Sequence, residues 1–166
     1  MAPPPCCAPD RGREAAYLAE SMAFDGTDLD IPKPLTELVG VAGRIVTGGW
    51  WPGPTVAVVA ARADARSSSA STTDGRTVTI RLSTPQRTLA TLVHELAHAL
   101  AGVGAGHGAA FRRALLDVVG VVTNLDSTDR RRRLHVDALH DAYVAAGLDV
   151  GDRHWPAPPE PGAIAL

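Results

Sequence analysis

The chain has 166 residues, 45% of them hydrophobic, and its mean hydropathy is +0.02. A chain of this length and composition can bury one hydrophobic core, so we expect a single globular domain over residues 10–150. The formal net charge of −2 argues against a protein that coats nucleic acid. No run of about 18 apolar residues is present, so the sequence predicts no membrane-spanning helix.

Both ends of the chain are rich in proline. Residues 1–9 carry four prolines and the adjacent pair Cys6 and Cys7, and residues 151–166 carry four more prolines. Both segments are expected to be disordered tails. Two neighbouring cysteines do not make a disulfide framework, so incidental thiols are favoured over metal binding or a redox role. The first residues lack the basic and apolar stretches of a secretory signal, and we expect a cytosolic (cytoplasmic) protein.

Five segments show the spacing of an amphipathic helix, with apolar residues three and four apart. The third segment begins after Thr84, a predicted N-cap, and has Pro85 at its first helical position. Glycines follow several of these segments and predict where the helices end. Helices are predicted at residues 11–24, 35–46, 85–101, 108–122 and 129–146.

Two segments have the character of strands. Residues 77–82 alternate apolar and polar side chains, which is typical of a half-buried antiparallel strand. Residues 55–61 contain a short apolar run bounded by proline and a polar loop. The dipeptide Asp74-Gly75 in the polar stretch at residues 64–75 is a turn signal between two strands. Together with the helices, these segments predict an α+β fold.

The most informative stretch is the pattern H-E-x-x-H at residues 94–98. Residues four apart lie on one face of a helix, so His94 and His98 can hold one metal ion from consecutive turns. Glu95 follows the first histidine and stays close to the metal without binding it, which suits a general base. Given the six histidines and five glutamates of the chain, chance placement gives this pattern in under about one such chain in a hundred.

A hydrolytic zinc site needs a third protein ligand and an open fourth position. His107 is the candidate, because it follows a glycine-rich turn and opens the next predicted helix. The turn directs that helix back toward the helix of the H-E-x-x-H motif. The expected ligands of Zn²⁺ are therefore His94, His98 and His107.

These motifs resemble those of a known group of metallohydrolases. H-E-x-x-H, a short glycine-bearing turn and H-G-x-x-F at residues 107–111 look like the compact zincins of the SprT and minigluzincin type. The chain more closely resembles a family of small HExxH metallohydrolases of actinobacteria and their phages. Members similarly have an R-x-x-x-Y-x-A-E helix, a Gly-Thr pair and an A-R-x-x-A-R-S-S-S-A stretch, here at residues 13–20, 26–27 and 61–70.

The resemblance covers about residues 10–150. It implies a zincin-like single domain in which a small antiparallel sheet packs on the metal helix. It also implies zinc ligation by His94, His98 and His107 and catalysis by Glu95, but it implies no particular substrate. In zincins an extended peptide pairs with a sheet edge, so residues 77–82 or a neighbouring strand are the expected substrate edge, with a plain sheet edge as the alternative.

The expected reaction is hydrolysis of a peptide bond by an activated water molecule. Zinc held by three imidazoles lowers the pKa of its water to about 7, and Glu95 accepts the proton and passes it to the leaving amine. Asp117 and Asp137 are candidates for orienting the imidazoles from behind. Candidates for stabilising the oxyanion, which the sequence does not rank, are Tyr143, His135, His140 and Arg81.

Two other functions stay open beside a metallopeptidase with a peptide or protein substrate. One is a zinc-stabilised domain that binds a partner without catalysis, although a purely structural site has no use for Glu95. The other is a DNA-associated protease of the SprT type, for which only the resemblance and Arg130–Arg133 argue. Four successive helical residues point in four directions, so this run favours a solvated helix start over a nucleic-acid contact. Nuclease or amidase chemistry would use the same activated water.

Overall fold

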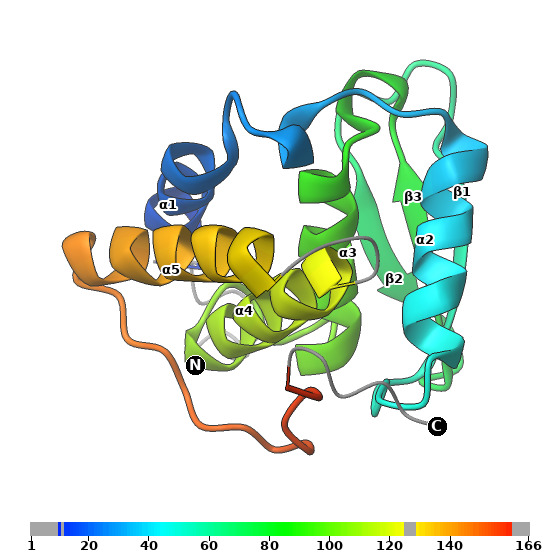
Figure 1. Ribbon diagram of the computed structural model, residues 1–166. Helices are drawn as coiled ribbons and strands as arrows, with labels where there is room; N and C mark the ends of the chain where they lie inside the picture. Colours follow the sequence, from blue (N-terminus) through cyan, green and yellow to red (C-terminus); the bar gives the residue numbers. More distant parts are fainter. Residues whose placement is uncertain (1–9, 11, 125–128, 161–166) are drawn as a thin grey trace, which may run out of the picture.

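The computed structural model describes residue 10 and residues 12–124 and 129–160. Within these residues the chain forms five α-helices and one three-stranded sheet, an α+β arrangement (Figure 1). The helices lie close to their predicted ranges, because each has the apolar spacing that tertiary packing requires. The elements are α1 (Arg13–Phe24), η1 (Asp28–Asp30), α2 (Leu35–Thr47), β1 (Thr55–Ala60), β2 (Ser69–Thr72), β3 (Thr77–Leu82), η2 (Thr84–Gln86), α3 (Leu89–Ala101), α4 (Ala109–Asn124) and α5 (Asp129–Ala145).

The sheet is mixed, so the expectation of an antiparallel sheet is wrong for one of its two strand pairs. β3 lies in the centre, with β1 parallel to it on one side and β2 antiparallel to it on the other. The sequence does not predict β2, because Ser69–Thr72 is polar apart from one alanine. The Asp74-Gly75 turn joins β2 to β3, with Gly75 at φ 70°. Since β2 reverses the chain between β1 and β3, these two neighbouring strands run in the same direction.

One face of the sheet is apolar and supports the helix of the H-E-x-x-H motif. Val78 and Ile80 of β3 are buried, whereas Arg81 on the opposite face is exposed, which confirms the predicted alternation. α2 packs against β1, and α3 packs against β2 and β3. The position of α3 is therefore fixed by the sheet.

The remaining helices form a second layer around α3. α4 packs against both α3 and α5, and α5 packs in turn against α1. In Figure 1, α1 and α5 lie on the side of α3 away from the sheet. Leu96 of α3, Leu115 of α4 and Leu139 of α5 are among the fully buried side chains that fill this layer. This packing brings α1 opposite α3, although the two helices are far apart in the sequence.

The start of α3 differs from the prediction. Thr84–Gln86 forms a short 3₁₀ helix, and α3 begins only at Leu89. The N-cap is Thr88, whose side-chain oxygen accepts a hydrogen bond from the backbone N–H of Thr91 at 3.1 Å. Pro85 remains in a first turn, because its fixed φ suits either kind of helix.

The segment after α5 follows an ordered path, in contrast to the expected disordered tail. The Arg153 guanidinium donates two hydrogen bonds to the Asp117 carboxylate, at 2.7 and 2.8 Å. Trp155 Nε1 donates a third hydrogen bond to the same carboxylate at 2.9 Å. Because Asp117 belongs to α4, residues 151–160 are held against that helix.

α5 buries one side and exposes the other. Leu139 and Tyr143 are buried, whereas Leu134 and Val144 are 65% and 63% exposed. Several predictions concern residues outside the described part of the chain. They are the disordered tails at 1–9 and 161–166 and the side chains of Arg130 to Arg132.

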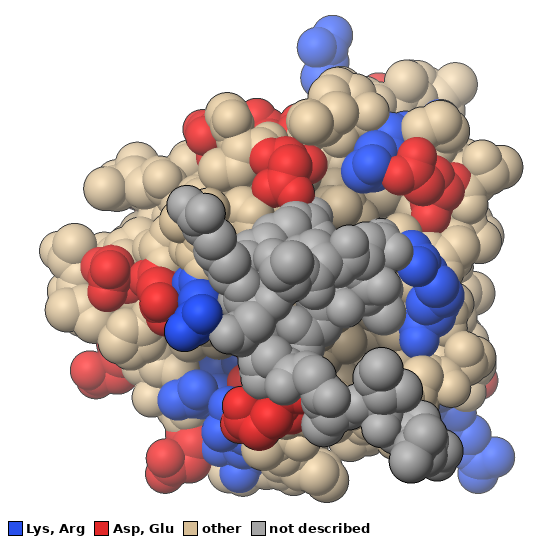
Figure 2. Space-filling model, viewed as in Figure 1, with Lys and Arg blue, Asp and Glu red and all other residues tan. Residues whose placement is uncertain are grey.

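The visible surface carries both signs of charge. On the face shown in Figure 2, acidic and basic side chains are interspersed among the described residues, without a continuous basic area. Among the helices of residues 12–124 and 129–160, none is long and apolar enough to cross a membrane.

Candidate metal centre

The three predicted ligands converge on one point. Nε2 of His107 lies 3.3 Å from Nε2 of His94 and 3.2 Å from Nε2 of His98. One ligand atom from each of the three rings lies within 4.8 Å of the others. His94 and His107 are buried, and His98 is partly buried. The described residues thus contain a three-histidine group that could bind a metal ion.

The backbone between the second and third histidine explains this convergence. α3 ends at Gly102, which has φ 104°, and the chain then turns through Gly106, which has φ 63°. Both values favour glycine over residues with a side chain. A Cβ atom on Gly106 would also meet Oδ2 of Asp10 at 3.2 Å. Gly106 therefore allows both the turn and the close approach of a carboxylate to His107.

A carboxylate from α1 orients the first imidazole. Oε2 of Glu20 lies 2.7 Å from Nδ1 of His94, and both side chains are buried. Burial lowers the pKa of His94, but the hydrogen bond and charge of Glu20 outweigh it, and the pKa is raised. A carboxylate beside Nδ1 favours the tautomer with the proton on that nitrogen, which leaves the lone pair of Nε2 for a metal ion.

A second carboxylate orients the third imidazole. Oδ2 of Asp10 lies 2.6 Å from Nδ1 of His107 and also accepts a hydrogen bond from the backbone N–H of His107 at 3.1 Å. Burial alone would raise the pKa of Asp10, but its hydrogen bond to His107 and the charge of that ring lower it. Arg112 donates a hydrogen bond at 2.7 Å to the carbonyl oxygen of His107 and so fixes its backbone. His107, at the end of the glycine-rich turn, is therefore held through both its side chain and its backbone.

The remaining imidazole has no such partner among the described residues. Nδ1 of His98 is buried and makes no hydrogen bond within the described part of the chain. Burial and the neighbouring rings of His94 and His107 lower the pKa of His98 to about 3. His98 is therefore neutral at physiological pH, which is the form that binds a metal.

The arrangement fits a divalent metal with nitrogen ligands. Tetrahedral zinc, with Zn–N bonds of about 2.0–2.1 Å, places its ligand nitrogens about 3.3–3.4 Å apart. The two Nε2 separations of 3.2 and 3.3 Å agree with that spacing. Carboxylates beside Nδ1 of His94 and His107 favour the tautomer that leaves the Nε2 lone pair of each ring for a cation.

Two aromatic rings enclose the three imidazoles. Phe111 of α4 is fully buried, and its ring centroid lies 4.9, 4.5 and 4.8 Å from those of His94, His98 and His107. Tyr17 of α1 is 42% exposed and stacks on His94, with the centroids 5.1 Å apart and the rings 14° from parallel. The three imidazoles thus pack on the buried ring of Phe111, and the half-exposed ring of Tyr17 covers part of them.

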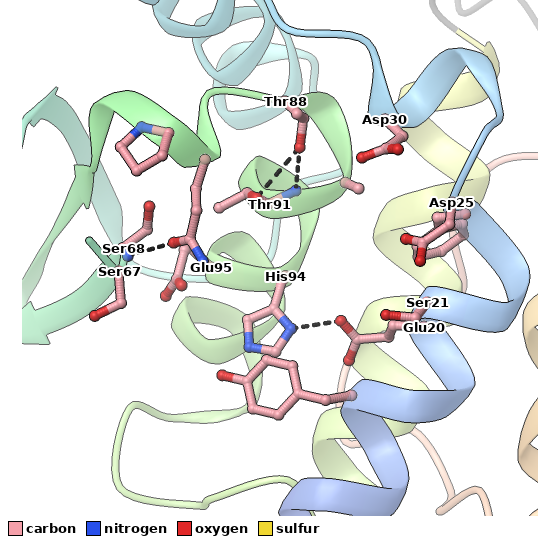
Figure 3. A pocket seen from close by; sticks show the side chains of 15 residues that line it. Glu20, Ser21, Asp25, Asp30, Ser67, Ser68, Thr88, Thr91, His94 and Glu95 are labelled. Atoms are coloured by element: carbon pink, nitrogen blue, oxygen red, sulfur yellow. Dashed lines mark hydrogen bonds and ion pairs between the residues drawn. The ribbon is translucent and has the colours of Figure 1, made fainter.

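A cavity of about 310 Å³ opens beside the histidines. Its walls come from α1, from the segment that leads into β2, and from the first turns of α3. In Figure 3, Ser67 and Ser68 lie on one side of the cavity, Asp25 and Asp30 lie on the other, and His94 and Glu95 lie between them. His94 and the predicted base Glu95 therefore both line an open cavity.

Glu95 has the environment of a general base. Its side chain is buried on α3 next to His94 and lines the cavity. Burial raises the pKa of Glu95, opposed by the charge of His94 and assisted by that of Glu20. A raised pKa brings the carboxylate closer to neutral pH, where a base can accept and later release a proton.

None of the sequence-based candidates for oxyanion stabilisation lines this cavity. The Tyr143 side chain of α5 is buried in the core, and its hydroxyl has no hydrogen-bond partner among the described residues. His135 pairs with Asp28 at 2.7 Å, and His140 is exposed on α5. Arg81 donates a hydrogen bond to Ser71 on the outer face of the sheet.

The candidates for orienting the imidazoles are also wrong. Asp117 is engaged with Arg153 and Trp155, and Asp137 is exposed on α5 beside a separate cavity. Glu20 and Asp10 take the orienting role that was expected of Asp117 and Asp137. Glu20 carries a signal in the sequence, because it belongs to the R-x-x-x-Y-x-A-E pattern and shares a helix face with Tyr17.

Comparison with known proteins does not extend this description. No protein-family model, curated protein or solved structure matches the chain.

Replacing Glu20 by alanine is expected to weaken zinc binding by about 10–100-fold, because His94 loses the carboxylate that sets its tautomer and orientation. Competition with a chromophoric chelator measures the affinity. Glu14→Ala is the matched control, since Glu14 is exposed on the same helix. Equal zinc affinities for Glu20→Ala and the wild type would contradict the role given to Glu20.

Proposed function

We propose that the protein is a zinc-dependent hydrolase whose substrate class is the peptide bond. The observation that carries the proposal is the convergence of three imidazole Nε2 atoms beside a buried glutamate that lines a cavity. A three-histidine site leaves a position free for water or substrate, whereas structural zinc sites are closed by four protein ligands. The buried carboxylate of Glu95 next to that group supports catalysis over a purely structural role.

The mechanism assigns one task to each side chain. When bound, the ion supplies a Lewis acid and lowers the pKa of a water molecule, so that a nucleophile is available near neutral pH. Glu95 accepts the proton of that water and later delivers it to the leaving amine. Glu20 and Asp10 keep the Nδ1 protons of His94 and His107 in place, so that both rings stay in their ligating form.

The proposal includes a zincin-like fold of the SprT and minigluzincin type. In its support, the sheet packs on the helix of the H-E-x-x-H motif, and one residue, Gly108, separates the third histidine from the next helix. The interspersed charges on the face in Figure 2 give no support to the DNA-associated variant of this function. The expected location remains the cytosol.

A strand edge is available for an extended substrate on β2, a neighbour of β3. β3 is the central strand, so its backbone groups are already paired on both sides. β2 is an edge strand, and Ser67 and Ser68, which lead into it, line the cavity. We therefore place an extended peptide along β2, where main-chain hydrogen bonds would hold it beside Glu95.

Metal removal and reconstitution test the proposed function. Chelator-treated protein should take up about one zinc ion per chain, and zinc loading should restore cleavage of a mixed library of quenched fluorescent peptides. Bound zinc should also raise the melting temperature, since it binds only the folded chain. Zinc binding without cleavage of any peptide would favour the non-catalytic, partner-binding alternative.

A further inference from the structure

The proposed reaction develops negative charge on the carbonyl oxygen of the substrate, and this oxygen needs a hydrogen-bond donor. We propose that the hydroxyl group of Tyr17 is this donor. The inference rests on the proposed hydrolysis and adds a catalytic residue to it. Tyr17 belongs to α1, whereas the H-E-x-x-H motif belongs to α3.

The position of the ring supports the assignment. Tyr17 lines the same cavity as His94 and Glu95. Its centroid lies 5.1 Å from that of His94 and 5.1 Å from that of His107. Phe111 also contacts these imidazoles, but its ring is fully buried and has no polar atom. Of the two rings that enclose the site, only Tyr17 offers a donor to a molecule in the cavity.

Neighbouring groups hold the phenol in place without occupying the cavity. Arg13, one turn earlier on α1, places its guanidinium 5.6 Å from the centre of the Tyr17 ring. This cation–π contact and the stack on His94 both restrict the position of the ring. The phenol of tyrosine carries an O–H group that can donate a hydrogen bond to a substrate oxygen.

Packing alone is the competing explanation for Tyr17. A phenylalanine would stack on His94 equally well and would remove only the hydroxyl group. Tyr17→Phe therefore separates the two roles, and its fold should be unaffected because Tyr17 is 42% exposed. The matched control is Tyr143→Phe, which removes the hydroxyl of the second tyrosine of the chain, a buried group outside the cavity.

Two measurements on the zinc-loaded proteins test the inference. In Tyr17→Phe, kcat should fall by about 10²–10³-fold with KM unchanged, as for the loss of one oxyanion donor. Calorimetric titration with methylphosphonate, a small tetrahedral oxyanion, should give an affinity at least about tenfold weaker than that of the wild type. Zinc affinity and melting temperature should not change, and Tyr143→Phe should match the wild type in every assay.

The two measurements keep the inference separate from the proposed function. If the wild type cleaves no peptide, the proposed function fails, and the methylphosphonate titration alone decides the role of Tyr17. A kcat or a methylphosphonate affinity within twofold of the wild type in Tyr17→Phe would overturn the inference. Equal losses in Tyr143→Phe, or no methylphosphonate binding to the wild type, would overturn it too.

Discussion

Replacing Glu95 by glutamine is expected to lower the rate of peptide hydrolysis by about two to four orders of magnitude. Glutamine has nearly the same shape, but its amide cannot accept a proton from water at neutral pH. Because Glu95 is not among the three converging nitrogen ligands, the variant should still bind zinc. The measurements are kcat on the best peptide of the library and zinc content by elemental analysis.

The comparison needs a second glutamate variant. Glu14→Gln changes an exposed carboxylate on α1 and should leave both kcat and zinc content as in the wild type. Equal activity of Glu95→Gln and the wild type would end the assignment of Glu95 as the base. Loss of zinc from Glu95→Gln would mean instead that this carboxylate helps to hold the metal.

Replacing His107 by alanine is expected to reduce zinc affinity by roughly a hundredfold or more. Zinc binding in structural sites provides about 10–16 kcal/mol, so one ligand in four contributes about 3 kcal/mol, or about two orders of magnitude in affinity. The variant also leaves Asp10 without the imidazole that it contacts at 2.6 Å. Chelator competition measures the affinity, and hydrolysis at limiting zinc should fall in parallel.

His140→Ala is the matched control for this loss. His140 is exposed on α5 and lies beside a separate cavity, so its removal should not change zinc binding. Undiminished zinc affinity in His107→Ala would remove His107 from the ligand set. It would also require another group to complete the site, because two histidines of α3 alone would remain.

Much of the fold follows from local patterns. β3 was predictable from its alternation, and α1, α2, α4 and α5 from apolar residues three and four apart, because these periods are properties of the backbone geometry. β2 escaped prediction, since its polar residues gain their structure from pairing with β3 and not from their own propensity. The parallel direction of β1 depends on that additional strand.

The candidate site also has a part that local patterns predict and a part that they do not. His94, Glu95 and His98 lie within five successive residues, so helix geometry alone brings two imidazoles and a carboxylate together. His107 was predictable because a short turn rich in glycine connects it to the same helix. Glu20 lies 74 residues before His94, and Asp10 lies 97 residues before His107. No local period links residues at such separations.

The sequence by itself determined that His94, Glu95, His98 and His107 lie together, because their spacing is a property of one helix and the turn after it. Only the tertiary structure decided what surrounds them. α5 packs against both α1 and α4, and this packing places Tyr17 and Glu20 of α1, and Asp10 shortly before that helix, around the imidazoles. The physical reason is that hydrogen bonds and ring contacts between distant segments arise from burial of apolar helix faces, which fixes neighbours in space and leaves no periodic trace in the chain.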